Sequence, residues 1–188
     1  MTEEYVVLLD ESGTAIGREP KATVHHADTP LHLAFSIFLF DYEGRSLFQQ
    51  RALHKPTWPG IWSNACCGHP APGESLTDAA HRRLGEELGI TQSLNLHLML
   101  PKFRYRAQWG AIWENEICPV FIGFYDGAVQ SNSQEVAATT WLDWDVFTLC
   151  RGEGPSVFSD DFSPWCRWEA TALLQLPNFN PTPIAVAC

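Results

Sequence analysis

The segment "GHPAPGESLTDAAHRRLGEELGI", residues 68–90, carries the most regular pattern in the chain. Its apolar residues recur four positions apart: Leu76, Ala80, Leu84 and Leu88. This spacing is typical of one face of a helix. Ser75 and Asp78 are spaced as a capping box, and Gly89 is suited to end a helix. The sequence therefore predicts a helix that begins after Ser75 and ends before Gly89.

Strand patterns lie on both sides of this helix. Residues 4–13, "EYVVLLDESG", predict a strand that ends in a turn, and residues 32–52, "HLAFSIFLFDYEGRSLFQQRA", predict a hairpin. Residues 114–125, "ENEICPVFIGFY", are strand-like. The two prolines and the glycine of residues 54–62, "HKPTWPGIW", predict a loop instead.

The C-terminal part adds helices to these strands. Residues 139–150, "TTWLDWDVFTLC", predict a strand that leads into a short helix. A last helix is expected near Ser163, with Pro164 in its first turn. Together these elements predict a single α/β domain in which a mixed β-sheet lies between helices. We expect this domain to span residues 1–175, followed by an irregular tail at 176–188, whose sequence contains three prolines.

Composition excludes several classes of function. The chain has 188 residues, of which 45% are hydrophobic and 18% charged, as is typical of one globular domain. Its net charge of -10 argues against a broad nucleic-acid surface. No apolar run approaches the ~18–20 residues that a membrane span requires. The acidic start "MTEEYVVLLDESG" and the six scattered cysteines lead us to expect a cytoplasmic protein without disulfides.

Residues 68–90 also fit a fixed pattern, G-x5-E-x7-R-x-U-x-E-E-x-G-U, in which U is bulky and apolar. The matching positions are Gly68, Glu74, Arg82, Leu84, Glu86, Glu87, Gly89 and Ile90, and Leu88 occupies the variable position before Gly89. This pattern resembles the Nudix box, a loop-helix-loop whose carboxylates hold a divalent metal against a diphosphate. A plainer alternative is two surface ion pairs, Arg82 with Glu86 and Arg83 with Glu87, each worth ~0.3–0.5 kcal/mol.

Arg83 is a departure from that pattern. Nudix hydrolases usually carry a glutamate directly after the arginine of the box, and that glutamate helps to bind metal. A cation at this position favours tight binding of an anionic diphosphate and poor activation of water for its cleavage.

Further candidate ligands occur in pairs outside the box. Alternate residues of an extended backbone point to the same side, so Glu114 with Glu116, and Cys67 with His69, can each project into one cleft. His25 and His32 add two imidazoles. Three imidazoles and two carboxylates suit zinc, manganese or iron rather than magnesium alone. The alternative for each histidine taken singly is an ordinary surface or core position.

Several longer blocks resemble one branch of the Nudix fold, the type I isopentenyl-diphosphate isomerases. The blocks are "HHADTPLHLAFS", "RALHKPTWPGIWSNACCGHP", "FRYRA", "ENEICPVF" and "FSPW", and they cover the chain from Lys21 to about Trp168. The resemblance implies a Nudix-type fold and an acid-base pair formed by Cys67 and Glu116. It also implies one Mn²⁺- or Zn²⁺-type ion, whose ligands are His25, His32, His69, Glu114 and Glu116. Glu87 then helps to bind a Mg²⁺ ion that carries the diphosphate.

The same resemblance implies further roles around a small isoprenoid diphosphate. Tyr105 is expected to donate or shuttle protons, and Trp165 to stabilise a carbocation, although packing at a helix start is the alternative for Trp165. The diphosphate is expected to contact four cations: Lys21, Arg51, Lys55 and Arg83. Cys66 would point away from Cys67 and fill the core. Trp109 and Trp113, in the expected loop "QWGAIW", have no assigned role beyond packing or lid formation.

Isomerisation moves a double bond by adding a proton at one carbon and removing one at another, which two groups on opposite faces of the substrate can do. The nearest alternative is a Nudix hydrolase of a diphosphate. A non-catalytic zinc module is a weaker alternative, because adjacent Cys66 and Cys67 lack the spacing of structural zinc ligands. We favour a monomer that binds neither nucleic acid nor membrane.

Overall fold

The structure is a computed structural model, and it describes residues 4–149, 160–177 and 179–181. Its elements, in chain order, are β1 Tyr5–Leu9, β2 Ala15–Pro20, β3 His32–Leu33, β4 Phe35–Phe40, β5 Arg45–Arg51, β6 Trp62–Asn64, β7 Cys66–Gly68, α1 Leu76–Leu88, β8 His97–Leu100, β9 Arg104–Trp109, β10 Ile112–Ile117, β11 Val120–Phe124, β12 Val136–Asp143, α2 Trp144–Leu149 and α3 Pro164–Leu174.

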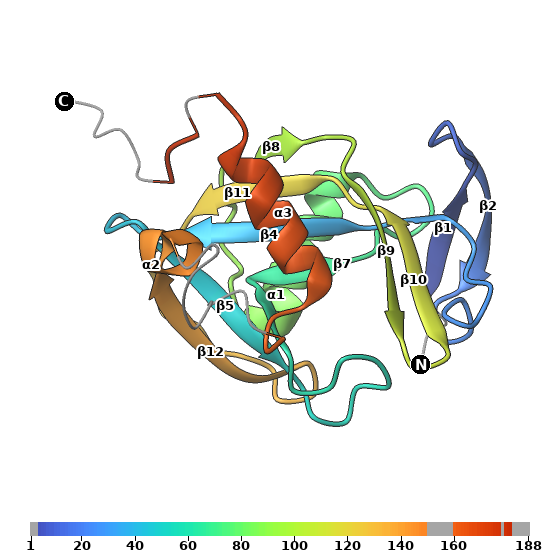
Figure 1. Ribbon diagram of the computed structural model, residues 1–188, viewed down its shortest axis with the longest axis horizontal. Helices are drawn as coiled ribbons and strands as arrows, with labels where there is room; N and C mark the ends of the chain where they lie inside the picture. Colours follow the sequence, from blue (N-terminus) through green and yellow to red (C-terminus); the bar gives the residue numbers. More distant parts are fainter. Residues whose placement is uncertain (1–3, 150–159, 178, 182–188) are drawn as a thin grey trace.

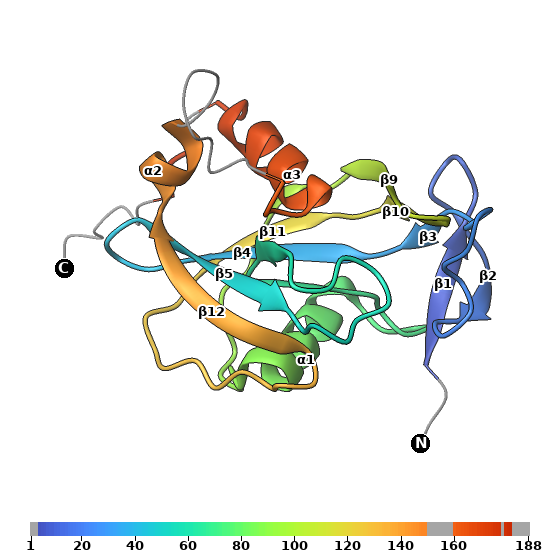
Figure 2. The same cartoon turned by 60° about the horizontal axis from the view of Figure 1, so that its bottom comes forward.

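The strands form two sheets. The larger one has the order β12-β5-β4-β11-β8, with β6 paired to β5 and β7 paired to β4. It is mixed, because β11 runs parallel to β4 whereas β12 runs antiparallel to β5. The smaller sheet has the order β2-β1-β3-β10-β9. Helix α1 covers one face of the larger sheet and α2 and α3 cover the other (Figures 1 and 2), which confirms the predicted arrangement of a mixed sheet between helices.

The core has two layers, and β4 separates them. All six residues of β4 are buried, as expected of a strand that is covered on both faces. Phe35, Ile37 and Leu39 pack in the layer that contains α1. Phe38 and Phe40 pack in the layer that contains α2 and α3. Burying each of these side chains contributes about 1.5–3 kcal/mol, so the central strand fixes both helical layers.

Helix α1 confirms the prediction from residues 68–90. The Ser75 hydroxyl accepts a hydrogen bond from the Asp78 amide at 3.1 Å, and the helix ends at Gly89 with φ 69°. A Cβ atom on Gly89 would lie 2.9 Å from the carbonyl oxygen of Gln130, so this position requires glycine for space as well as for conformation.

Two predicted segments differ from the structure. The strand-like segment at residues 114–125 is divided between two strands in different sheets, β10 and β11, which are separated by Cys118 and Pro119. Proline has no amide hydrogen to donate to a sheet, and the chain changes sheets at this point. The expected loop "QWGAIW" is mostly strand, because β9 and β10 form a hairpin that turns at Gly110 with φ 59°.

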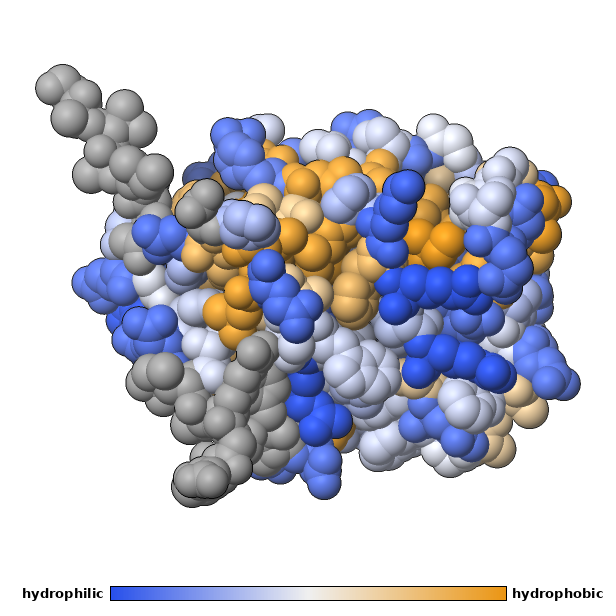
Figure 3. All heavy atoms as spheres, turned by 45° about the horizontal axis from the view of Figure 1, so that its top comes forward, coloured by the Kyte–Doolittle hydropathy of each residue, from blue (hydrophilic) through white to orange (hydrophobic). Residues whose placement is uncertain are grey.

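The end of the chain lies only partly within the described residues. Most of the predicted tail, including residue 178 and residues 182–188, falls outside them. Within the described part, Leu176 and Phe179 pack against the layer that contains α2 and α3. Among the described helices none is both long and apolar enough to cross a bilayer. The side that carries β8 shows an apolar area with polar borders in Figure 3, and Leu98 of β8 is 45% exposed.

Candidate active site and metal centre

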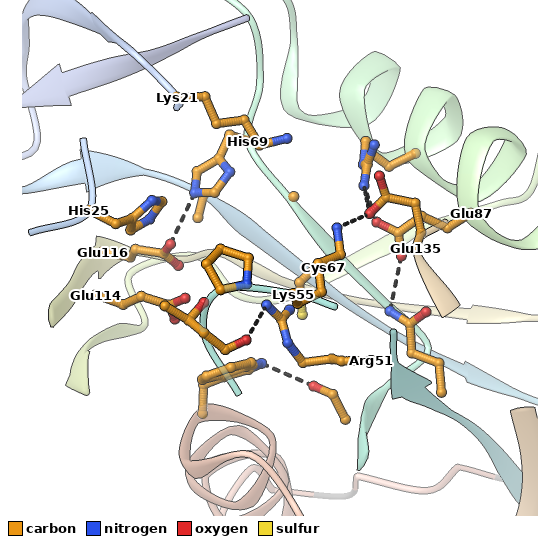
Figure 4. Close-up of a pocket in the computed structure, with 18 of the residues that line it drawn as sticks. Lys21, His25, Arg51, Lys55, Cys67, His69, Glu87, Glu114, Glu116 and Glu135 are labelled. Atoms are coloured by element: carbon orange, nitrogen blue, oxygen red, sulfur yellow. Dashed lines mark hydrogen bonds and ion pairs between the residues drawn. The ribbon is translucent and has the colours of Figure 1, made fainter. Parts of the chain in front are cut away.

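One cavity gathers the predicted site residues. It has a volume of about 210 Å³. The predicted residues that line it are Lys21, His25, Arg51, Lys55, Cys67, His69, Arg83, Glu87, Tyr105, Glu114, Glu116 and Trp165. His32 is the one predicted residue that does not line it, and it is fully buried behind Glu116. In Figure 4, His25 and Glu116 lie on one side of Cys67, and Glu87 and Glu135 lie on the other.

Three imidazoles and one carboxylate converge at one end of the cavity. One ligand atom from each of His25, His32, His69 and Glu116 lies within 4.8 Å of the other three. Strand pairing explains part of this arrangement, because β3 places His32 directly beside Glu116 of β10. His69 follows β7, and its Nε2 lies 3.0 Å from Glu116 Oε1. Segments far apart in the sequence therefore supply a compact set of nitrogen and oxygen donors.

The hydrogen bonds of these imidazoles leave ring nitrogens that could bind a cation. His32 Nδ1 lies 2.9 Å from the carbonyl oxygen of Pro30, which can only accept, so Nδ1 carries a hydrogen. His32 Nε2 then faces Glu116 Oε1 at 3.3 Å, and only a proton or a cation between the two makes that approach favourable. His25 Nε2 and His69 Nδ1 are buried and have no hydrogen-bond partner among the described residues. The donor set therefore fits a divalent metal ion.

Electrostatics keeps these groups in a metal-binding state. Burial lowers the pKa of His25 to about 4, and burial also lowers the pKa of His69. Burial alone would raise the pKa of Glu116, but its hydrogen bonds with His32 and His69 hold that pKa well below its usual range. At neutral pH His25 and His69 therefore offer neutral imidazole lone pairs to a cation, together with the Glu116 carboxylate. Burial alone would lower the pKa of His32, but its hydrogen bond with Glu116 raises that pKa, so a metal ion would take the place of a proton between these two groups.

Tyr105 connects the two glutamates of β10. Its hydroxyl lies 2.7 Å from Glu116 Oε2 and 3.1 Å from Glu114 Oε2. Pairing of β9 with β10 sets Tyr105 directly opposite Glu116, and Glu114 projects to the same side two residues earlier. Burial, then the charge of Glu116, raises the pKa of Glu114 to about 7, and burial raises the pKa of Tyr105 well above 10. Glu114 is not among the four convergent ligands, although it borders them.

The two adjacent thiols point in opposite directions, as predicted. Cys66 is fully buried in the layer of α1, whereas Cys67 lines the cavity. Cys67 Sγ lies 3.2 Å from Asn64 Oδ1 and 3.3 Å from the Ser36 hydroxyl. Burial raises the pKa of Cys67 to about 12, so this side chain is a thiol at neutral pH.

The far end of the cavity holds cations that already have partners. Arg83 is 8% exposed, forms an ion pair with buried Glu87 and lies 2.8 Å from Glu86. Burial alone would lower the pKa of Arg83, but the charge of Glu87 raises it well above its usual value. The arginine pair of the sequence therefore forms two kinds of contact: Arg82 with Glu86 is a surface pair at 3.3 Å, whereas Arg83 with Glu87 is buried.

Sequence reasoning missed Glu135, which precedes β12 and lines the same cavity. Its carboxylate forms an ion pair with Lys55 and lies 3.4 Å from Arg83. No local pattern marks this residue, because its neighbours in space come from other parts of the chain. Lys21 is similarly paired, with Glu4 at 2.7 Å. The cations that would contact a diphosphate are thus already bound to protein groups.

Aromatic side chains and Arg51 form the remaining wall. Trp165 stacks on Tyr105 with ring centroids 5.8 Å apart, and its Nε1 donates to the Ser63 hydroxyl at 3.0 Å. Arg51 donates to the carbonyl oxygens of Thr57 and Trp58, and its guanidinium lies 5.7 Å from the Trp165 ring. Trp165 is therefore held on several sides.

The two tryptophans without an assigned role lie near this wall. Trp109 packs against Trp58 with centroids 5.6 Å apart, and Arg106 lies over the Trp113 ring at 4.2 Å. Both residues belong to the β9–β10 hairpin.

Comparison with known proteins agrees with this arrangement. A model of the NUDIX domain matches residues 30–173. An isopentenyl-diphosphate Delta-isomerase from Saccharopolyspora erythraea is 54% identical over 95% of this chain and 89% of its own length. The proteins of the same name from Mycolicibacterium vanbaalenii and Rhizobium rhizogenes are 52% and 44% identical. They cover 92% and 98% of this chain, and 92% and 86% of their own lengths.

Solved structures support the fold alone. Protein DR0079 of Deinococcus radiodurans superposes with a TM-score of 0.60 at 18% identity, over 76% of this chain and 85% of that one. A MutT protein of Methanosarcina mazei superposes with a TM-score of 0.54 at 22% identity, over 76% and 97%. Because the domain model covers most of the sequence and relatives of 44–54% identity cover nearly all of it, the chain belongs to the NUDIX family and, within it, to the isopentenyl-diphosphate Delta-isomerases.

Proposed function

We propose that the protein interconverts isopentenyl diphosphate and dimethylallyl diphosphate, a step of isoprenoid biosynthesis. The observation that carries this proposal is the joint position of Cys67 and Glu116 in one cavity whose far end is lined by Lys55 and Arg83. The names of its relatives state the same reaction. A hydrocarbon held between a thiol and a carboxylate, with its diphosphate bound elsewhere, can exchange protons without breaking a phosphorus–oxygen bond.

Cys67 and Glu116 form the acid-base pair in this proposal, with Tyr105 as a proton shuttle. One of the pair adds a proton to the terminal alkene carbon, and the other removes a proton from the carbon nearer the diphosphate. Their resting states support the pairing, because the pKa of about 12 keeps Cys67 protonated while the pKa of Glu116 lies well below its usual range. The reaction is reversible, so each group donates in one direction and accepts in the other.

A divalent ion of the manganese or zinc type would be held by His25, His32, His69 and Glu116, beside Glu114. Such an ion supplies positive charge that keeps the bound carboxylate ionised and fixed in place. Glu87 would contribute to a separate magnesium site at the diphosphate. Its carboxylate accepts a hydrogen bond from the Gln49 amide at 2.9 Å, which orients it at the far end of the cavity.

The hydrocarbon end of the substrate passes through a state that resembles a tertiary carbocation. Trp165 is proposed to face that charge, because a cation near an indole ring in a dry site gains ~2 kcal/mol or more. The burial of Tyr105 and Trp165, which stack on each other, also keeps water away from the cation.

The diphosphate is proposed to contact Lys21, Arg51, Lys55 and Arg83. Arg83 takes the place of the glutamate that hydrolases usually carry, which favours holding the diphosphate over cleaving it. Arg83→Glu is therefore expected to weaken binding of the diphosphate, and an unchanged KM would remove Arg83 from the site. We also propose that the protein acts as a cytoplasmic monomer.

The decisive experiment incubates the purified protein with isopentenyl diphosphate, magnesium and either manganese or zinc. Formation of dimethylallyl diphosphate supports the proposal, whereas release of phosphate would identify a hydrolase. Metal analysis of the same sample tests the His/Glu site. Cys67→Ala and Glu116→Gln are expected to lose nearly all turnover, by about 10²-fold or more, while remaining folded. Cys66→Ala is the matched control and should stay active. A loss as large as that of Cys67→Ala would mean that the other thiol reacts.

A further inference from the structure

Glu169 of α3 is a buried carboxyl group that the proposed reaction does not use. It is 0% exposed, and its helix, α3, crosses over β4 and β11 in Figures 1 and 2. Its Oε1 accepts from the Cys118 thiol at 3.7 Å, and its Oε2 has no hydrogen-bond partner among the described residues. An unsatisfied buried oxygen destabilises a fold, so such a group calls for a reason.

No described cation offsets this carboxyl, in contrast to Glu87 and Glu116, whose partners are an arginine and two histidines. Burial raises the pKa of Glu169 well above its usual value, and hydrogen bonding by Ser36 and Cys118 opposes that shift only in part. Burial without a cationic partner therefore favours the neutral form of the Glu169 carboxyl group. A neutral carboxyl carries one O–H donor, which needs an acceptor inside the core.

Ser36 is the group between Glu169 and Cys67. It is fully buried on β4, directly opposite Cys67 in the pairing with β7. Its hydroxyl lies 3.3 Å from Cys67 Sγ and 3.5 Å from Cys118 Sγ. One serine oxygen thus bridges the thiol that lines the cavity and the thiol that contacts Glu169.

A count of donors gives one consistent set of directions for these bonds. The two amide hydrogens of Asn64 go to the carbonyl oxygens of Ile37 and Cys66, each at 3.1 Å, so Asn64 Oδ1 accepts the thiol hydrogen of Cys67. The thiol hydrogen of Cys118 goes to Glu169 Oε1. Ser36 can then donate its single hydrogen to Cys67 Sγ. Its lone pairs are left for the Glu169 carboxyl group, with which Ser36 interacts.

We propose that Glu169 is a positioning residue for Cys67, in which a neutral carboxyl donates to Ser36 and Ser36 donates to the sulfur. When Cys67 gives up its proton, the sulfur becomes a thiolate in a buried site. The Ser36 hydrogen bond stabilises that anion, and the bond from Glu169 strengthens Ser36 as a donor because linked hydrogen bonds polarise one another. No proton leaves Glu169 in this arrangement. The inference rests on the proposed role of Cys67.

The kinetic test compares Glu169→Met with Glu169→Gln. Methionine removes the donor and is expected to lower kcat by about 10-fold to 100-fold with KM unchanged, the size of one hydrogen bond to a charged group. Glutamine keeps an N–H donor and should restore most of kcat. In the Ser36→Ala background the methionine variant should cause no further loss, because the path to Cys67 is already interrupted. A loss in Glu169→Gln as large as in Glu169→Met would overturn the inference.

Leu173→Ala is the control for a general weakening of α3 packing. It removes a fully buried side chain from the same helix, and Leu173 does not line the cavity. This variant should lose stability but keep kcat per folded molecule. If it loses kcat as Glu169→Met does, the effect of Glu169 is structural and the inference fails.

A second measurement is independent of turnover, and therefore separates this inference from the proposed reaction. The infrared difference between wild type and Glu169→Gln should contain the carbonyl stretch of a protonated carboxylic acid at neutral pH. Ser36→Ala should shift that band, because the acid loses its acceptor. A missing band, or a band that Ser36→Ala leaves unchanged, would overturn the inference even in an active isomerase. The expected band and shift would support it even if no isomerisation is found.

Discussion

Replacing Arg83 with methionine should destabilise the protein much more than the same change at the adjacent Arg82. Arg83 is 8% exposed, and its guanidinium is the cationic partner of Glu87, which is 4% exposed. Without it, Glu87 keeps hydrogen bonds with the Gln49 amide at 2.9 Å and with the Cys66 thiol, and neither group carries a positive charge. Breaking a buried pair on one side costs about 3–5 kcal/mol, because the remaining charge is left uncompensated. For a protein of this size that corresponds to a fall in Tm of about 6–20 °C.

Arg82 is the matched control, since it occupies the next position of the same helix. Its side chain is 36% exposed and its partners, Glu74 and Glu86, lie near the surface. Arg82→Met should cost about 1 kcal/mol. The free energy of unfolding of both variants is measured by equilibrium denaturation in urea, which unlike guanidinium does not screen charge. Equal losses in the two variants would refute the claim that Glu87 depends on a buried partner.

A double variant sharpens this test. Arg83→Met with Glu87→Leu removes both charges and leaves apolar side chains of similar length. Such replacements of buried pairs are often neutral or stabilising, so most of the loss should be recovered. A double variant as unstable as Arg83→Met alone would show that the lost energy comes from Glu86 or Glu135 instead.

Three further predictions concern metal, pH and backbone. Adding manganese or zinc at about 1,000 times its Kd should stabilise the metal-free protein by about 4 kcal/mol, which is measured as a rise in Tm. His25→Gln should abolish this rise, whereas His81→Gln, which changes a histidine outside the cluster, should retain it. The reverse pattern would reject the site. The hydrogen bond from Arg82 lowers the pKa of Glu74 in the folded protein. This ion pair therefore contributes less than about 1 kcal/mol to the free energy of unfolding above pH ~4.3, and the contribution disappears as the pH falls through the folded-state pKa. The difference in Tm between wild type and Glu74→Gln should accordingly close in acid, and a constant difference would contradict the ion pair. Gly89→Ala should lower the free energy of unfolding by more than the ~1–2 kcal/mol of left-handed strain, because the new Cβ would lie 2.9 Å from the Gln130 carbonyl oxygen. Gly73→Ala is the control, since Gly73 has φ 85° and open space around it, and it should cost only that strain. Urea denaturation decides this, and equal costs would exclude a steric contribution at Gly89.

The sequence predicted the elements whose signals are local. Helix α1 follows from a four-residue repeat and two end signals, and α3 begins where Ser163 and Pro164 predict it. The grouping of Glu114 with Glu116, and the opposite directions of Cys66 and Cys67, follow from the alternation of a strand. These inferences depend only on residues that are close in the sequence, which determine the spacing of apolar positions and the signals at helix ends.

The missed features depend on contacts between distant segments. Glu135 enters the cavity because β12 pairs with β5, and nothing near residue 135 predicts that pairing. Ser36 contacts Cys67 from another strand, and Glu169 contacts Cys118 from a helix. No pattern in the sequence around Ser36 or Glu169 predicts these contacts. Pro119 indicates an interruption in the strand, but it does not show that the chain changes sheets there. The strands that pair with β10 and β11 come from other parts of the sequence. The family resemblance proposed roles for residues to which local patterns assign none, and those roles stay predictions.

The paired state of the cations that line the cavity bears on how inhibitors of this protein should be designed. Lys55 is engaged by Glu135, Lys21 by Glu4, and Arg51 by two backbone carbonyl oxygens. An anionic compound therefore gains less than the number of cations suggests, since each new contact displaces an old one. A compound with a cationic group that binds Glu135 and an acidic group that binds Lys55 would replace both sides of the ion pair that it breaks. Such a compound would bind this pocket in preference to one lined by unpaired lysines.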